Sequence, residues 1–367
     1  MAPRTYSEQA ATAVAGAQLQ AVNAHLISPH RSTHAVLARP RGRHRGATAA
    51  IRRRHPGALR RLYAVPGPPP AAVRERVDHA IVVNIYRALS CLRVGLLVVM
   101  VHEGGWCVCD VLDEDQNCRM FARDFSTVFV DVGFRCAFCG QLFAAVARRC
   151  TPTGVCCAYR SFARSAREHP FPQAWNDCWD ALKWAAANAK TLGADPAVGF
   201  IVGGASADGN LSAAMTQLAR DEKLDPPLTG QYLNFPALCH FDVVQEKYRP
   251  EMISGAEKVD DPVLGNMLRS AKALEAALRL DVSNPLFSPL IHPKGLDGLP
   301  PAYIQVGGMV PLRDTDLVHE RVLQEEYGVP TRLDIYKGFG HTFWANWPQM
   351  DMLKKCVEDN SRSEAVA

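Results

Sequence analysis

A serine stands where an apolar strand pattern changes into a helical pattern. The stretch "FIVGGASADGNL", which begins at Phe200, places Ser206 after the apolar run and before a helix expected from about Asn210. Tiny residues flank Ser206, as a sharp strand–turn–helix elbow requires when it presents a nucleophile. The pattern G-x-S-x-G breaks at Asp208, which stands where its last glycine belongs. Since Ser206 or Asp208 can also cap the helix, this stretch alone leaves nucleophile and helix cap equally open.

Two further stretches carry groups that a nucleophilic serine needs. The stretch "VVMVHEGGW" ends an apolar run with Gly104 and Gly105, which have no Cβ to keep backbone N–H groups away from an oxyanion. It is similar to an HGGG loop with Glu103 in place of the first glycine. In "YKGFGHTFW", His341 follows Ser206 in chain order, where a hydrolase places its general base. An imidazole with an ordinary pKa of about 6.5 suits that proton transfer near neutrality.

Together, these stretches resemble the hormone-sensitive-lipase-like branch of the α/β-hydrolases, the fold-3 esterases. The resemblance covers roughly residues 77–350 and includes "DEDQNCRMFARD", "EHPFPQAWNDCWDALKW" and "SNPLFSPLI". It implies an α/β-hydrolase fold with a mostly parallel central sheet, helices on both faces and a small helical cap. It also implies that Ser206 is the nucleophile and His341 the general base. The implied backbone donors for the oxyanion belong to Gly104, Gly105 and Ala207.

The acid of the catalytic triad is missing from its family position. In the family this acid lies in a D-P-L-R-D-like stretch, and the corresponding "GGMVPLRD" places Val310 there. Valine cannot orient an imidazole, and loss of the acid lowers kcat by roughly 10⁴, or about 5 kcal/mol. Asp314 or Asp316 could replace it if the loop shifted, although both are expected a helical turn away. Glu103 and Asp208 would disfavour an oxyanion unless their side chains point to water.

The wider pattern alternates strands with helices. Near-continuous apolar strands between helices favour a mostly parallel sheet that is covered on both faces. The predicted strands are 80–86, 95–101, 127–134, 197–204, 302–308 and 331–338, and two clear helices are 175–189 and 314–328.

Charge divides the chain into an arm and a body. Residues 1–76 hold thirteen Arg and two acids for a net charge of +11, so the remainder of this +4 chain is net −7. We interpret 1–76 as an Arg-rich, Pro-rich disordered arm, either a solvated tail or a transit, nuclear or nucleic-acid segment. No nucleic acid is expected as a partner, because the arm has almost no aromatic residues for stacking. The hydrolase domain is placed at 77–356, its cap at about 238–285, and a polar tail at 357–367.

Residues 136–164 do not fit the body. They hold five Cys, four Arg and no acid. Cys136 and Cys139 form a CxxC, but no second pair follows at zinc spacing, so no metal site is expected. Family members run almost directly from the position of Arg135 to the E-H-P stretch, so this insert adds 29 residues. We interpret the insert as an inserted surface loop, and one hypothesis for its origin is a retained intron or another gene-model error.

The resemblance implies a carboxylesterase or lipase-type serine hydrolase that acts on a small ester without a cofactor, weakened by Val310. The alternatives are a catalytically inactive small-molecule binder, similar to the plant gibberellin receptors of this branch, or a defective product without a stable fold. A homodimer is left open. No transmembrane segment is expected, because the longest apolar run falls well short of about 18 residues. The absence of an export signal favours the cytoplasm, with mitochondrial targeting by the arm as the alternative.

Overall fold

The computed structural model describes most of the predicted hydrolase domain. These residues belong to one compact unit of the chain. The arm up to residue 70, the insert 136–164 and the tail 357–367 lie outside the described residues. The described ranges are 71–76, 81–87, 95–106, 114–125, 127–135, 169–259, 264–265, 271–341 and residue 343.

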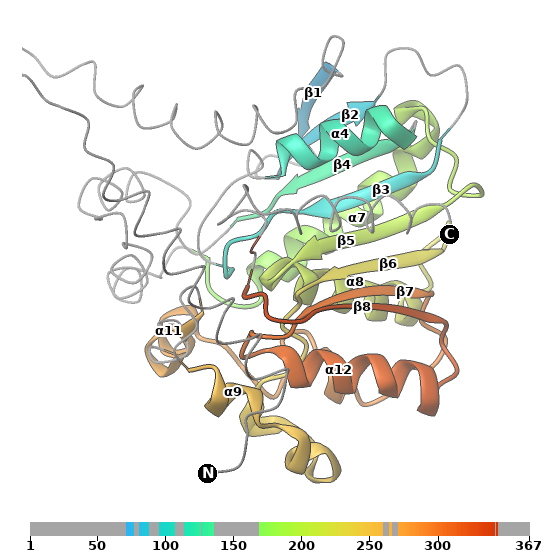
Figure 1. Ribbon diagram of the computed structural model, residues 1–367. Helices are drawn as coiled ribbons and strands as arrows, with labels where there is room; N and C mark the ends of the chain where they lie inside the picture. Colours follow the sequence, from blue (N-terminus) through green and yellow to red (C-terminus); the bar gives the residue numbers. More distant parts are fainter. Residues whose placement is uncertain are drawn as a thin grey trace, which may run out of the picture. The chain divides into compact units, whose positions relative to one another are not determined.

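An eight-stranded sheet forms the centre, in the order β1-β2-β4-β3-β5-β6-β7-β8 (Figure 1). The first two pairings, β1 with β2 and β2 with β4, are antiparallel, and all later pairings are parallel. This confirms the predicted mostly parallel sheet. The strands are β1 (Ala71–Arg76), β2 (Val82–Arg87), β3 (Leu97–Val101), β4 (Val128–Gly133), β5 (Phe200–Ala205), β6 (Gly230–Asn234), β7 (Ala302–Gly307) and β8 (Thr331–Tyr336).

Helices cover both faces of this sheet. In Figure 1, α4 lies in front of β2 and β4, whereas α7 and α8 lie behind β3, β5 and β6. The longer helices are α4 (Asp115–Phe125), α7 (Gln173–Leu192), α8 (Ala207–Asp221), α11 (Ala271–Leu278) and α12 (Arg313–Arg321). Shorter pieces are α9 (Ser254–Glu257), the 3-10 helices Phe241–Val243, Glu246–Glu251 and Pro289–Ile291, and a π-helical turn Val322–Glu326 that extends α12.

Double-sided burial explains the strand sequences. Every residue of β3, β5 and β7 is buried, so these strands read as continuous apolar runs instead of alternating patterns. One apolar cluster lies between the sheet and α7 and α8, and a second joins β6 and β7 to α12. The central strands are therefore fixed on both sides, and their carboxyl ends form a rigid edge for loops.

The boundary of the predicted arm differs from the structure at one point. Its last six residues, Ala71–Arg76, form β1, which pairs with β2 along its whole length. The segment "AAVRER" carries three charges among short apolar residues, so its composition alone resembled the arm. Among the described strands β1 lies at the edge of the sheet, and an edge strand tolerates such charges.

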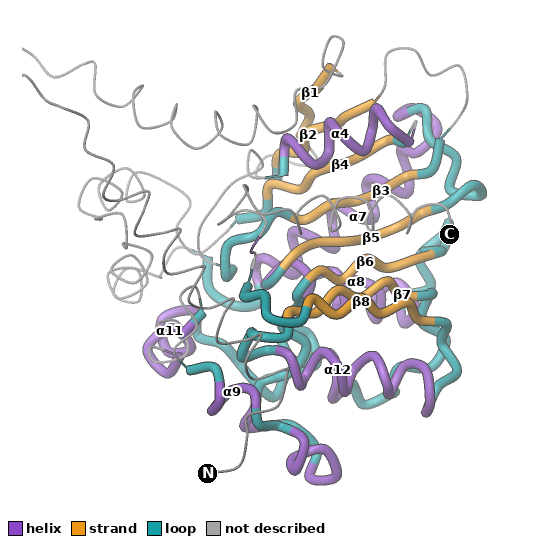
Figure 2. The backbone as a smooth tube through the Cα atoms, viewed as in Figure 1, coloured by secondary structure: helices purple, strands orange, loops and turns teal. Residues whose placement is uncertain are grey.

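Short helices occur in the described part of the predicted cap segment 238–285. Figure 2 shows α9 and α11 beyond the ends of the strands. Helix α11 accounts for Ala271–Leu278 of this segment. Residues 260–263 and 266–270 lie outside the described residues.

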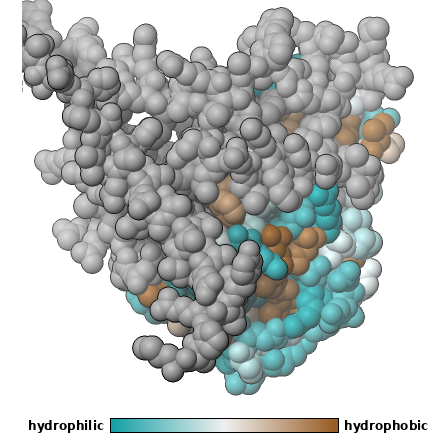
Figure 3. Space-filling view, viewed as in Figure 1, coloured by the Kyte–Doolittle hydropathy of each residue, from teal (hydrophilic) through white to brown (hydrophobic). Residues whose placement is uncertain are grey.

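The described surface exposes few large apolar side chains. On the face in Figure 3, hydrophilic residues border a smaller apolar area among the coloured residues. Scattered single apolar side chains are normal on folded proteins and need no partner. In the part of the chain that the structure describes, no helix is both long and apolar enough to span a bilayer. The exposed large apolar side chains are Val198, Ile253, Val259 and Ile335.

Candidate active site

Ser206 occupies a sharp turn between β5 and α8. Its φ is +61°, a conformation that residues with a side chain rarely adopt outside strained functional turns. The turn is tight because a Cβ on Gly204 would lie 2.8 Å from the backbone carbon of Asp208. The helix begins at Ala207, three residues earlier than the sequence indicated. These features define a strand–turn–helix elbow with the Ser206 side chain at its turn.

The side chain of Ser206 meets His341. Ser206 Oγ and His341 Nε2 are 2.7 Å apart, so the hydroxyl can donate to the imidazole. Ser206 occupies the N-cap position of α8 but makes no side-chain capping bond, which removes the helix-cap interpretation of this residue. The ring of Phe235 meets the His341 ring edge-on at 6.2 Å. Thus two side chains separated by 135 positions form one hydrogen-bonded pair.

Burial controls the charge of His341. The residue is 2% exposed, and desolvation of the charged form lowers its pKa to about 3. Near neutrality the imidazole is therefore uncharged and has a lone pair available for a proton. The conjugate imidazolium, in contrast, is disfavoured in this buried position.

Gly104 and Gly105 lie in the loop that follows β3. Strands β3 and β5 are parallel neighbours, and Val101 pairs with Gly204, so this loop and the elbow leave the same edge of the sheet. Three successive residues have positive φ: Gly104 (145°), Gly105 (60°) and Trp106 (60°). The two glycines adopt this backbone without a Cβ penalty. At the base of the loop, the His102 ring stacks on Phe134 at 4.3 Å.

Val310 occupies the turn between β7 and α12 and is fully buried. Backbone hydrogen bonds hold this turn against the one that leads to His341: Gly308 N–H donates to Tyr336 O, and Met309 N–H to Phe339 O. The position therefore has the chain connections expected of a triad acid. Its isopropyl group, however, has no oxygen that could accept a proton from an imidazole.

The Asp314 carboxylate binds groups near α9 and at the start of α12. Its carboxylate accepts the amides of Ile253 and Ser254, at 2.8 and 2.6 Å, and Nε of Arg313 at 2.7 Å. Burial raises the pKa of Asp314, but the hydrogen bonds from Arg313 and the two amides outweigh this and lower it overall. These contacts fasten α12 to α9 and do not bring the carboxylate to His341. Asp316 is fully buried in α12, where desolvation raises its pKa well above the usual range.

Asp208 does not point to water. The Asp208 side chain is fully buried. The pKa of the Cys178 thiol in α7 is raised mainly by burial of the thiol, and the negative charge of Asp208 is the second largest cause. The carboxylate therefore lies between α8 and α7. Gly204 leaves the space that its Cβ needs. Glu103, the other unexpected acid, is partly exposed.

Sequence reasoning missed Asn210, Trp106 and Phe287. Asn210 Nδ2 lies 2.7 Å from the carbonyl oxygens of both Ala237 and Phe287, so α8 is tied to two loops. Phe287 belongs to "SNPLFSPLI", a stretch that supported the family resemblance without a role for any of its residues. Such contacts depend on tertiary packing and leave no local pattern. Among the described residues, no group of three or more His, Cys, Asp or Glu could hold a metal ion.

The fold and the elbow are those of an α/β-hydrolase. The chain belongs to the alpha/beta hydrolase fold family, whose model matches residues 137–345, more than half of its length. The resemblance to the fold-3 branch is thereby confirmed.

Curated relatives include named esterases. An AB hydrolase superfamily protein of Schizosaccharomyces pombe is 33% identical over 266 residues, which cover 72% of this chain and 68% of that protein. A versiconal hemiacetal acetate esterase of Dothistroma septosporum is 30% identical over 247 residues, or 66% of this chain and 65% of that enzyme. The match therefore spans about two thirds of the length of these relatives.

Solved structures agree on the fold. The crystal structure of vibralactone cyclase is 26% identical, with a TM-score of 0.73 and coverage of 94% of this chain and 93% of that chain. A hyperthermophilic esterase from the archaeon Pyrobaculum calidifontis is 25% identical, with a TM-score of 0.64 and coverage of 84% and 88%, respectively.

Proposed function

We propose that the protein is a serine hydrolase of the carboxylesterase or lipase type that acts on a small ester. The observation that carries this proposal is the 2.7 Å contact between Ser206 Oγ and His341 Nε2 at the strained elbow. A nucleophile and a base within hydrogen-bond reach are the minimum for acyl transfer through serine. The esterases among the relatives support the same reaction class.

In this mechanism, Ser206 Oγ attacks the ester carbonyl carbon while His341 Nε2 accepts the hydroxyl proton. The carbonyl π electrons move to oxygen, and the oxyanion is stabilised by backbone N–H groups. Collapse of this intermediate breaks the ester C–O bond, and His341 returns its proton to the departing alkoxide. Water then repeats the sequence on the acyl-enzyme and releases the acid. The proposed donors are the N–H groups of Gly104, Gly105 and Ala207.

Val310 makes this enzyme a weakened one in our proposal. His341 begins neutral, as a base must, because burial holds its pKa at about 3. The imidazolium that forms after proton transfer receives no carboxylate from position 310. Loss of that acid typically removes roughly 10⁴ from kcat while leaving the oxyanion hole and substrate binding.

One observation favours a second candidate, an inactive protein that binds a small molecule. The triad acid is replaced by a hydrocarbon at a fully buried position. Such a site retains an elbow and a loop of backbone donors, which can hold a carbonyl ligand without cleaving it. The two functions differ in the reactivity of one oxygen atom, that of Ser206.

A fluorophosphonate probe tests that reactivity. We expect covalent labelling of the wild-type protein at Ser206, no labelling of Ser206→Ala, and slow hydrolysis of p-nitrophenyl acetate by the wild type alone. An unlabelled wild type without turnover, but with thermal stabilisation by short esters or lactones, would identify the binder instead. Circular dichroism of Ser206→Ala checks that lost labelling reflects the missing oxygen and not unfolding.

A further inference from the structure

Trp106 has an unfavourable backbone directly after the two glycines of the oxyanion loop. Its φ is +60°, in a region that large side chains rarely occupy. Such a conformation persists only where surrounding contacts over-determine it, and it is found mainly at functional sites. The contacts that hold Trp106 therefore also hold the preceding amides of Gly104 and Gly105.

An aromatic cluster supplies these contacts. The Trp106 ring is 6% exposed, lies 5.0 Å from the Phe287 ring and stacks on Trp175 at 6.1 Å. Tilted and offset ring pairs at such distances are favourable beyond the area that they bury. The indole Nε1 is buried without a hydrogen-bond partner among the described residues, which is unfavourable. Ring packing, not hydrogen bonding, is thus what the indole contributes here.

Phe287 is itself held by the helix that carries the nucleophile. Its carbonyl oxygen accepts a hydrogen bond from Asn210 Nδ2 at 2.7 Å, four residues after Ser206 in α8. The adjacent Leu286 carbonyl accepts one from Trp175 Nε1, also at 2.7 Å. Phe287 therefore contacts both halves of the site, through its carbonyl on the elbow side and its ring on the oxyanion side.

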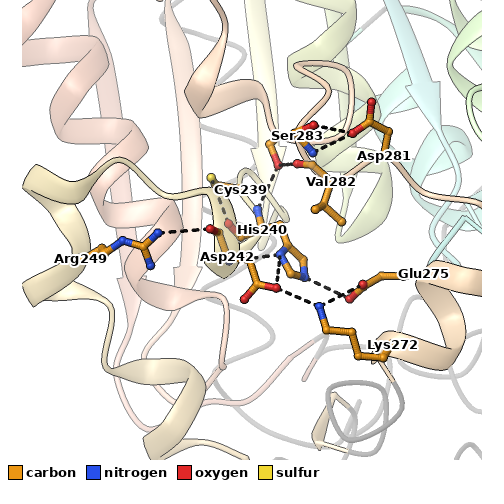
Figure 4. A network of polar contacts seen from close by, with 10 residues as sticks. Cys239, His240, Asp242, Arg249, Lys272, Glu275, Asp281, Val282 and Ser283 are labelled. Carbon is orange, nitrogen blue, oxygen red and sulfur yellow. Dashed lines mark hydrogen bonds and ion pairs between the residues drawn. The ribbon is translucent and has the colours of Figure 1, made fainter.

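The Phe287 ring also faces the cap segment. It lies 6.4 Å from the ring of His240, whose Nε2 is 3.2 Å from Glu275 in α11. Figure 4 shows His240 between Asp242 and Glu275, with Lys272 linking these two carboxylates at 2.9 and 3.3 Å. Phe287 therefore has an aromatic neighbour on the cap side as well.

We propose that Phe287 is a positioning residue: through Trp106, it sets the amides of Gly104 and Gly105 relative to Ser206. The inference rests on the proposed hydrolase function and adds a residue that does not touch substrate. Donors that act on developing charge must be aligned in advance, and loss of one such donor costs roughly 10²–10³ in kcat. Loosening the loop, rather than deleting a donor, should cost less.

The test is Phe287→Leu, in the wild type and in a Val310→Asp background that should be more active. We expect kcat to fall about tenfold with KM changed less than twofold, because oxyanion contacts act only in the transition state. A trifluoromethyl ketone joins its carbonyl carbon to Ser206 Oγ, passes the hydroxyl proton to His341 and places an oxyanion at these amides. Its affinity should fall by the same factor, and that of the unreactive methyl ketone should stay unchanged.

Matched variants separate positioning from general stability. Phe287→Tyr keeps the aromatic ring and should retain a kcat close to that of the parent protein. Phe171→Leu opens the same aromatic cluster at Trp175, whose ring lies 4.8 Å away, and should lower the melting temperature without the loss of inhibitor affinity. If Phe287→Leu does not fold, Phe287→Met offers a flexible unbranched side chain that adapts to the space and should show the same kcat loss.

Three outcomes would overturn the inference. Undiminished kcat and ketone affinity in folded Phe287→Leu would refute it and leave the hydrolase proposal standing. An equal loss of kcat and ketone affinity in Phe171→Leu would show that Phe287 contributes only general packing of the aromatic cluster. Absence of both turnover and ketone binding in the wild type and in Val310→Asp would refute the hydrolase proposal and this inference with it.

Discussion

At the scale of single residues, the proposed general base His341 has an unusual environment. His341 lies within hydrogen-bond reach of Ser206, but burial holds its pKa at about 3. A triad acid opposes this effect because its negative charge stabilises the imidazolium. Val310 leaves the imidazolium without such support from the turn that lies beside the His341 loop. The residue at position 310 should therefore set both the rate and its pH dependence.

Val310→Asp should raise kcat for short p-nitrophenyl esters at least tenfold and move the acid limb of the pH profile upward. In the wild type, His341 is protonated only near pH 3, so the rate constant should change little between pH 5 and 8. A carboxylate introduced by this substitution stabilises the imidazolium, so the imidazole pKa should rise toward about 6.5. Activity at pH 5 should then be clearly lower than at pH 7.5.

Val310→Asn is the matched control, since it adds polarity of similar size without charge. It should produce a smaller gain and little movement of the acid limb. The interpretation of Val310 as the limiting residue is wrong if folded Val310→Asp hydrolyses esters no faster than the wild type.

Part of the proposed site could be predicted from the sequence, for a physical reason. An elbow and a strand-end glycine pair are local patterns, so Ser206, Gly104 and Gly105 could be proposed from residue types and chain order. The environment of Asp314 could not, because its partners Ile253 and Ser254 are some sixty positions away. The burial of the Asp208 side chain likewise depends on packing against α7, and no sequence motif near the elbow indicates that packing.

At the scale of helices and strands, an element could be predicted when its apolar pattern was long enough to recognise. The fully buried strands β3, β5 and β7 produce long apolar runs that were recognised from the sequence. Strand β6 was missed because "GQYLN" offers few apolar residues, although β5 and β7 pair with it on both sides. Tertiary pairing overrides weak local preference at such a strand.

An ion pair joins the end of strand β4 to helix α7. Arg135 follows β4 and contacts Asp177 through Nε and Nη2, at 2.9 and 2.6 Å, and the Asp177 side chain is fully buried. Arg135→Ala should lower the free energy of unfolding by about 2 kcal/mol or more, because it removes the cation from a buried carboxylate. Urea denaturation measures this change.

The exposed pair Lys183–Asp180 in the same helix is the control. Both side chains are about half exposed, at 47% and 50%, so water screens their attraction. Lys183→Ala should cost less than about 0.5 kcal/mol. Similar costs for the two variants would contradict a special role for the Arg135–Asp177 pair in joining β4 to α7.

At the scale of the whole molecule, the question is how the body accommodates residues 136–164. Asp177 accepts hydrogen bonds from Arg135, the residue before this insert, and from Gln173 Nε2 at 2.8 Å. The two chain segments on either side of the insert therefore converge on one carboxylate. Joining them without the insert would leave residues 165–172 between Arg135 and Gln173. Connections of that length are ordinary between a strand and a helix.

Deletion of 136–164 should consequently leave the hydrolase body folded. The Arg135–Asp177 contact, the elbow and the Ser206–His341 pair all lie outside the deleted residues, so none of their atoms is removed. We expect a melting temperature within about 3 °C of the full chain, because the closure entropy of a connection changes only slowly with its length. Fluorophosphonate labelling of Ser206 should also keep its rate. Loss of folding on deletion would show that the insert stabilises the body, and would count against its origin as a retained intron; a transcript that lacks the segment would support that origin directly.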